Sequence, residues 1–229
     1  MSSSVSWNAV VVPSTPLMLG PLGTVTAQIG TPASSDAEIT TQVSRSVADP
    51  LGEVRELALE AVCWLVAEHP SRILVLTAPA DPANVARGIT EPLGERVARS
   101  LLSAVGYSGE MAVWAGDAPL DPAVLGDLEG SGVLVVGDGS ARRGEKAPGH
   151  LDERSFDFDT SVEKALRDCD AGALCALDDS LGSNLLAAGV PAFRALGSLP
   201  GASEHSAVVD YADDPLGVQY WIVRWTCAS

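Results

Sequence analysis

Three short stretches built almost entirely of aliphatic residues constrain most strongly what this chain can fold into. They read "AVVV" at 9–12, "ILVL" at 73–76 and "VLVV" at 133–136, and Pro or Gly residues follow each of them closely. Apolar runs of this length with such punctuation predict buried β-strands. Further strands are predicted at 111–114, 207–211 and 217–225, the last with alternating character.

Helical patterns separate these strands. Apolar residues at helical spacing, or cap residues at helix starts, predict helices over 53–67, 93–105, 121–128, 160–167, 171–177 and 180–188. The third of these opens with Asp121 and Pro122, and the fourth with the capping box Thr160 to Glu163.

Alternation of strands and helices favours an α/β fold. We expect a three-layer α/β/α domain with a mostly parallel central sheet, in which the last two strands pair antiparallel at one edge. The first four strands should share this sheet, with the loops 13–22 and 137–150 at the same edge. No internal repeat or break in composition is present, so residues 1–229 are predicted to form a single domain.

Composition limits the classes of partner. Hydrophobic residues make up 46% of the 229 residues, enough for a large core, and 30 acidic against 14 basic side chains give a net charge of −16. So acidic a chain argues against nucleic acid and anionic membranes as partners. No apolar run reaches membrane-span length, no basic leader is evident, and the four cysteines form no CxxC pair. We therefore expect a cytoplasmic protein with reduced cysteines and leave a homo-oligomer open.

Ligand sites of open α/β sheets lie beyond the carboxyl ends of the strands. Four loops qualify here: 13–22, 77–84, 137–150 and 212–217. The third contains "GDGSARRGEK", which combines Gly residues with clustered cations. It matches neither the P-loop nor the dinucleotide fingerprint.

Two interpretations of this basic loop remain open. In the first, Arg142, Arg143 and Lys146 form a site for a carboxylate or phosphate. In the second, the same cations pair with nearby carboxylates and simply order the loop. The nearby carboxylates considered are Glu145, Asp152 and Glu153.

Other residues of these loops complete the predicted ligand site. Asp138, Gly139 and Ser140 are expected to shape a turn after the third apolar run, and Ser14 and Thr15 to line the opposite wall. His150 is included because it lies in the same basic loop. No GxSxG motif or well-placed His supports a serine hydrolase.

Several stretches together resemble the class III extradiol ring-cleavage dioxygenase (LigB-like) family, in particular its short actinobacterial-type members of unknown function. They are "AVVVPSTPLMLGPL", "EVRELALEAV", "VVGDGSARRGEKAPGHLDERS" and "DDPLGVQYWIV", spread over nearly the whole chain. The resemblance implies a three-layer α/β fold. In active members it also implies a ferrous iron held by two His and one carboxylate, with a further His that assists proton transfer.

The chain departs from the family pattern at the positions that would hold iron. Ser14 stands where the resemblance implies the first His ligand, and "LTAPAD" offers no His for the second. Ala141 or Arg142 occupies the place of the catalytic His. Since iron selection needs imidazole together with carboxylate, no metal site and no cofactor is expected, and iron only if the family activity is retained.

The predicted function is therefore that of a degenerate, metal-free relative, a pseudoenzyme, that binds a small anionic or aromatic metabolite in a strand-end pocket. One alternative is an active dioxygenase or hydrolase with unorthodox ligands. Another is a protein-binding scaffold that uses Trp221 and Trp225.

Overall fold

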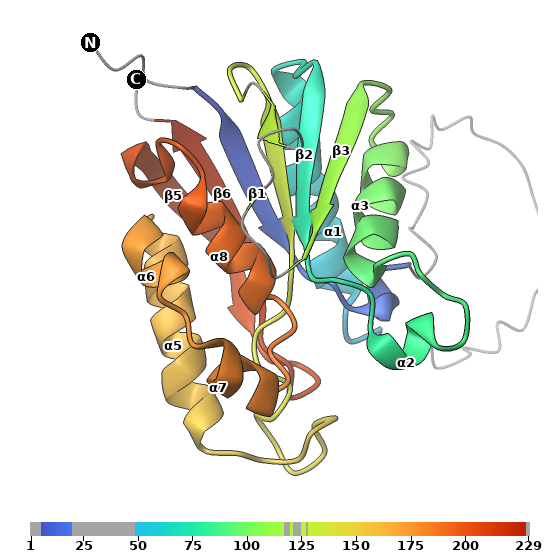
Figure 1. Cartoon of the computed structure of the whole chain (residues 1–229), viewed down its shortest axis with the longest axis vertical. Helices are drawn as coiled ribbons and strands as arrows, with labels where there is room; N and C mark the ends of the chain where they lie inside the picture. The colour runs from blue at the N-terminus through green and yellow to red at the C-terminus, as the bar shows by residue number, and fades with distance from the viewer. Residues whose placement is uncertain (1–5, 20–48, 117–119, 121–124, 127, 228–229) are drawn as a thin grey trace, which may run out of the picture.

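The computed structural model describes residues 6–19, 49–116, 120, 125–126 and 128–227 (Figure 1). Its strands are β1 (Asn8–Val12), β2 (Arg72–Thr77), β3 (Glu110–Ala115), β4 (Gly132–Val136), β5 (His205–Asp213) and β6 (Tyr220–Cys227). Its α-helices are α1 (Gly52–Ala67), α2 (Pro82–Val85), α3 (Leu93–Ala104), α5 (Arg154–Arg167), α6 (Ala171–Cys175), α7 (Asp179–Asn184) and α8 (Val190–Ser198). Two 3₁₀ turns, η1 (Pro16–Leu19) and η2 (Ala202–Glu204), complete the elements.

The six strands form one mixed sheet in the order β3-β2-β4-β1-β6-β5. The first four strands of this order pair in parallel, which confirms that the four apolar segments share a sheet. β6 runs antiparallel to both of its neighbours, β1 and β5. The predicted antiparallel pairing of the last two strands is thus also confirmed, and β6 in addition joins them to the parallel part.

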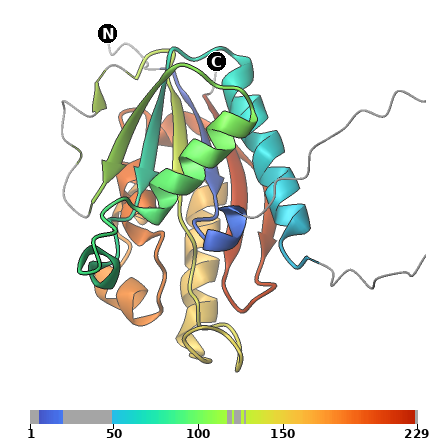
Figure 2. The same cartoon turned by 90° about the vertical axis from the view of Figure 1, so that its right-hand side faces the viewer.

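Helices cover both faces of the sheet, as Figure 2 shows. On one face, α1 and α3 pack over strand residues such as Val10, Val75 and Leu134. On the other, α5, α6 and α8 pack over their sequence neighbours, such as Val11 and Val135. Since successive strand side chains point to opposite faces, the continuous apolar runs are explained by burial on both sides.

Two helix predictions need correction. The helix predicted from Thr160 begins at Arg154, because Phe158 and Val162 supply a buried face that extends it towards its N-terminus. The Thr160 hydroxyl donates to the Phe156 carbonyl in mid-helix and caps nothing. α8 was not predicted at all, although its Pro191 lies in the first turn, where Pro is favoured. Most of the helix predicted over 121–128 lies outside the described residues.

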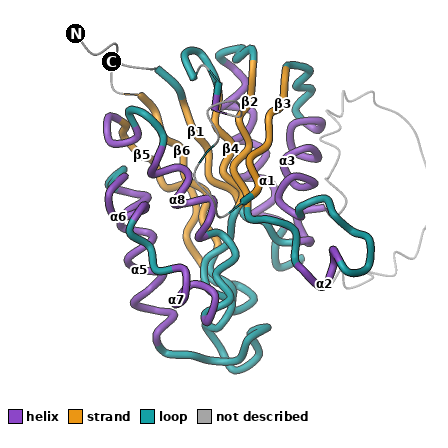
Figure 3. Tube along the Cα trace, viewed as in Figure 1, coloured by secondary structure: helices purple, strands orange, loops and turns teal. Residues whose placement is uncertain are grey.

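The connections leave the carboxyl edge of the sheet in two directions. The chain continues from β1 to α1 and from β2 to α3, both on one face, whereas β4 continues to α5 on the other. β4 lies between β2 and β1, and its connection leaves to the opposite face from theirs. The carboxyl end of β4 is therefore the topological switch point of the sheet. Figure 3 shows the loops after β1, β2 and β4 at this edge, beside α2 and α7.

Candidate functional site

A buried pair joins the loops after β1 and β4 at the switch point. The backbone N–H of Ser14 donates to Asp138 Oδ1 at 2.7 Å, and the Ser14 hydroxyl donates to Asp138 Oδ2 at 3.0 Å. Both residues are buried. These bonds confirm that the two loops lie at the same edge of the sheet.

Burial determines the pKa of the Asp138 carboxyl group in this pair. Desolvation raises the pKa of Asp138 from 3.8 to about 6, although both hydrogen bonds from Ser14 act in the opposite direction. Next to it, burial and the Asp138 charge raise the pKa of Tyr220 to about 12, while a hydrogen bond with Thr15 lowers it. A carboxyl group that changes charge near neutral pH is thus built into the strand-end region.

A second serine–aspartate pair repeats this geometry on the α5 side. The backbone N–H of Ser140 donates to Asp159 Oδ1 at 2.9 Å, and its hydroxyl donates to Asp159 Oδ2. Burial raises the pKa of Asp159, against these bonds and the charge of Arg143. Together the two pairs fix the segment 138–140 to β1 on one side and to α5 on the other.

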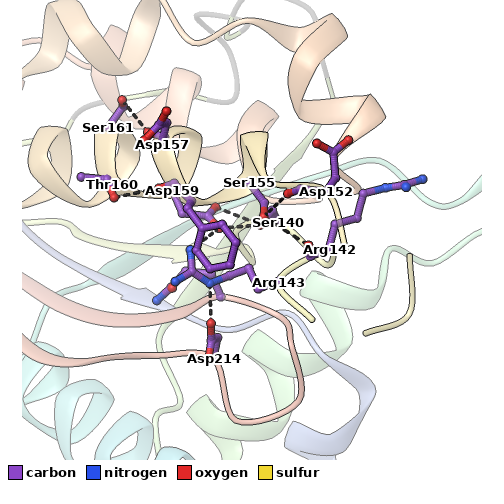
Figure 4. A network of polar contacts seen from close by, with 12 residues as sticks. Ser140, Arg142, Arg143, Asp152, Ser155, Asp157, Asp159, Thr160, Ser161 and Asp214 are labelled. Carbon is purple, nitrogen blue, oxygen red and sulfur yellow. Dashed lines mark hydrogen bonds and ion pairs between the residues drawn. The ribbon is translucent and has the colours of Figure 1, made fainter. Parts of the chain in front are cut away.

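Arg143 belongs to this second pair and not to an open anion site (Figure 4). Its Nη1 lies 3.2 Å from Asp159 Oδ2, and its Nε lies 2.5 Å from Asp214 Oδ2. Its guanidinium also stacks 4.6 Å from the centroid of the Phe156 ring. Two carboxylates therefore already neutralise this cation.

The segment after β4 is not the predicted turn. Residues 137–140 continue without a turn, and neither Gly137 nor Gly139 has a positive φ. The Gly139 N–H instead donates to the Gln219 carbonyl at 2.8 Å, and a Cβ at Gly139 would lie 2.6 Å from the Trp221 ring. These glycines are needed for close packing of the segment.

A pocket of about 500 Å³ opens beside the Ser14–Asp138 pair. The loop after β1, the loop 78–81 after β2 and the first turn of α3 form its walls. Ser14, Thr77, Gly94 and Arg96 are among its polar or close-packed lining residues. Ser14 thus both lines the pocket and donates to Asp138, which links the carboxyl group to the pocket.

A second pocket of about 440 Å³ adjoins the first. Loop 78–81 and Ala188 line both pockets. The remaining wall of the second comes from α7 and the start of α8, and is mainly apolar through Leu186, Val190 and Pro191. The two pockets form one strand-end site, with hydroxyl groups at one end and aliphatic groups at the other.

The nine predicted ligand residues divide into three groups. Ser14, with Thr15 and Asp138 beside it, lies at the strand-end site. Gly139, Ser140 and Arg143 belong to the buried network around Asp159. The rest of the basic loop lines neither of the two pockets; it comprises Arg142, Lys146 and His150.

In the second interpretation of the basic loop, the cations pair with nearby carboxylates. The structure shows different ion pairs from those considered. Asp152 pairs with Arg154, and the bond to that guanidinium is the main reason that the pKa of Asp152 falls to about 2. Arg142 contributes a weaker charge effect on the same carboxylate, while its Nε is buried without a hydrogen bond among the described residues. Lys146 and His150 are exposed.

The donors at the strand ends do not fit an iron site. The chain has three histidines, of which His69 precedes β2 and His205 begins β5, both at the opposite edge of the sheet. His150 is exposed, with Nδ1 3.3 Å from the Glu145 carbonyl. Among the described residues, no three His, Cys, Asp or Glu side chains are placed to hold a metal ion together. A site of two His and one carboxylate cannot be assembled from these positions.

The predicted ligand residues do not include Gly94 and Arg96, nor Thr77, which begins the strand-end loop 77–84. The sequence indicates the loop 77–84 as a strand end, but no local pattern connects this loop with the first turn of α3. One signal was present: Pro92 before an amphipathic helix leaves the first N–H groups without a side-chain cap, and the structure has none. Trp221 and Trp225, which the scaffold interpretation needs at the surface, are fully buried.

Compared with models of known protein families and with curated proteins, the chain matches none of them. The resemblance to the extradiol dioxygenase family therefore rests on the quoted stretches alone. Within the described residues, no helix combines the length and the apolar character that crossing a bilayer requires.

Proposed function

We propose that this protein binds a small metabolite at the switch point of its sheet and does so without a metal. In this proposal the chain has a three-layer LigB-like fold whose strand-end pocket is retained and whose iron ligands are replaced. The observation that carries it is the pocket of about 500 Å³ lined by Ser14, at the edge where ligands of α/β sheets bind.

The position of Ser14 supports a site that binds a metabolite and no longer carries out iron-dependent chemistry. The residue expected to be a His ligand is instead a serine whose hydroxyl hydrogen-bonds Asp138. A hydroxyl that donates inwards still offers its oxygen lone pairs to a ligand in the pocket. The proposal therefore gives Ser14 a role in orienting the ligand.

Retained enzyme chemistry is a second candidate, which the same site favours less. Asp138, with a pKa of about 6, could accept a proton near neutral pH. However, it does not line either pocket itself, and Ser14 is its contact with the pocket. Binding alone requires none of these groups to react.

A binding screen with a pocket-blocking variant tests this function. Ala188 is exposed and lines both pockets, so Ala188→Trp should fill the site without disturbing the core. Saturation-transfer NMR with pooled aromatic and aliphatic metabolites should find compounds that bind the native chain and not the variant. Equal binding to both proteins, or no binding by any pool at millimolar concentration, would overturn the proposal.

A further inference from the structure

We propose that the ligand of this site is a hydrophobic monocarboxylate, its carboxylate held at the first turn of α3 and its apolar body lying against Leu186 and α8. This inference rests on the proposed function and names the chemical class of its ligand. It places the anion at a different point from the basic loop after β4.

The first turn of α3 offers donors for an anion. α3 has twelve residues, its N-cap is Pro92, and no side chain caps it. Leu93, Gly94 and Arg96 of this turn line the pocket. The free N–H groups and the positive end of the helix dipole therefore face a cavity large enough for a ligand.

Thr77 independently places a hydroxyl group on the wall of the pocket, beside the first turn of α3. Its side chain is 1% exposed, and its hydroxyl makes no hydrogen bond within the described part of the chain. It lines the same pocket, against α3: a Cβ added to Gly94 would lie 1.8 Å from Thr77 Oγ1. A hydroxyl group that faces the pocket and has no protein partner among the described residues can donate to a ligand oxygen.

Arg96 supplies a charge that nothing else in the described residues neutralises. It lines the pocket, is exposed, and has no ion pair there. The two carboxylates of the lining are already engaged: Asp81 accepts N–H bonds from the first turn of α2, and Glu91 lies 3.7 Å from Arg99. A guanidinium and helix N–H groups suit a carboxylate well.

The surrounding charge favours one negative charge over two. Asp81 and Glu91 flank the single Arg96, and the whole chain carries −16. A phosphate dianion would meet repulsion that a carboxylate largely avoids. The carboxylate is therefore the anion that the lining matches.

Leu186 indicates the apolar part of the ligand. It follows α7 with a φ of +56°, a left-handed conformation in which glycine is the usual residue, and its side chain is 45% exposed. Bulky residues adopt this conformation at a cost of about 1 kcal/mol or more. The chain thus holds a leucine side chain on the wall of the second pocket at a position where glycine would be less strained.

Isothermal titration with phenylacetate and its neutral isostere phenylacetamide tests this inference. The native chain should bind phenylacetate at least about tenfold more tightly, the effect of one or more charge-assisted hydrogen bonds. Arg96→Gln and Thr77→Val should each weaken phenylacetate binding more than phenylacetamide binding, so that the preference for the carboxylate falls. Arg167→Gln, an exposed arginine on α5 on the other face of the sheet, should behave as native.

Leu186→Gly separates a ligand contact from a structural role. Relief of the left-handed conformation should leave the melting temperature equal or higher, whereas both compounds should bind about fivefold or more weakly. Equal affinity for phenylacetate and phenylacetamide, with Ala188→Trp abolishing both, would overturn the inference and leave the proposed function standing. Failure of both compounds, with other pooled metabolites bound, would overturn it as well. Failure of every compound would overturn the proposed function with it.

Discussion

Ser14 and Asp138, 124 residues apart, form a two-point contact in which one serine donates both its N–H and its hydroxyl to one buried carboxylate. It joins the loops after β1 and β4 at the point where their connections part to opposite faces of the sheet. The strand-end site is built around this contact.

Loss of the Ser14 hydroxyl should destabilise the fold. Ser14→Ala removes one of two donors to a buried carboxylate, and we expect the free energy of unfolding to fall by about 1–3 kcal/mol. Urea denaturation at pH 7 measures this. Ser103→Ala, at an exposed position of α3, is the control and should change stability by less than about 0.5 kcal/mol. Equal effects of the two variants would contradict the structural role of the pair.

The raised pKa of Asp138 predicts a pH dependence of defined sign. Between pH 3.8 and about 6 the folded state binds the proton more tightly than the unfolded state, so this group makes the fold less stable as pH rises through that window. Asp138→Asn removes the contribution. The stability of the variant relative to native should therefore rise by about 2 kcal/mol from pH 4 to pH 7 in urea denaturation. A difference independent of pH would contradict the burial of an ionisable group here.

Arg143 and Arg167 should differ sharply in their effect on stability. Arg143→Ala leaves the buried Asp159 without its cation, and we expect a loss of about 2–4 kcal/mol. Arg167→Ala breaks only an exposed pair with Glu163 and should cost less than about 0.5 kcal/mol. If thermal and urea unfolding give similar values for both variants, the network around Asp159 does not hold the loop.

Two glycines test the close packing of the segment after β4. A Cβ on Gly189 would lie 2.6 Å from the Asp138 carbonyl and from the Phe193 ring, so Gly189→Ala should cost about 1–3 kcal/mol. A Cβ on Gly144 would meet nothing within 4 Å, and Gly144→Ala should be neutral or slightly stabilising. Differential scanning calorimetry of the two variants should therefore give shifts of different sign or size; equal shifts would contradict this packing.

The expected absence of a bound transition metal can be checked by elemental analysis. Untagged protein, dialysed without chelator, should contain much less than one equivalent of iron or zinc, because the strand-end donors are hydroxyl, carboxylate and carbonyl groups without imidazole. One equivalent of either metal retained through dialysis would contradict this part of the account.

The sheet could be predicted from the sequence because burial on both faces leaves a local signal, the aliphatic runs. The two corrected helices show where local signals fail. Thr160 to Glu163 matches a capping box, yet the buried positions Phe158 and Val162 place those residues in mid-helix. The ionic partners of the basic loop could not be predicted for a similar reason. Its spacing shows a cluster of cations, whereas the carboxylates that neutralise Arg143 come from α5 and the β5–β6 turn, 16 and 71 residues away.

The pocket residues could be found only in part. Loops 13–22 and 77–84 are strand ends that the sequence indicates, and Ser14 follows from them. Thr77 and Arg96 line the same pocket because β2 and the first turn of α3 pack together, a contact that Gly94 permits and no local pattern displays.

The most direct test of the central claim is an amide ¹H–¹⁵N correlation spectrum of the labelled chain, titrated with a compound that the pooled screen finds to bind. We expect the largest shift changes at the amides of Ser14, Ala78, Gly94 and Ala188, which line the strand-end site. Largest changes around Arg143, Lys146 and His150, or changes scattered over the surface, would contradict a binding site at the switch point.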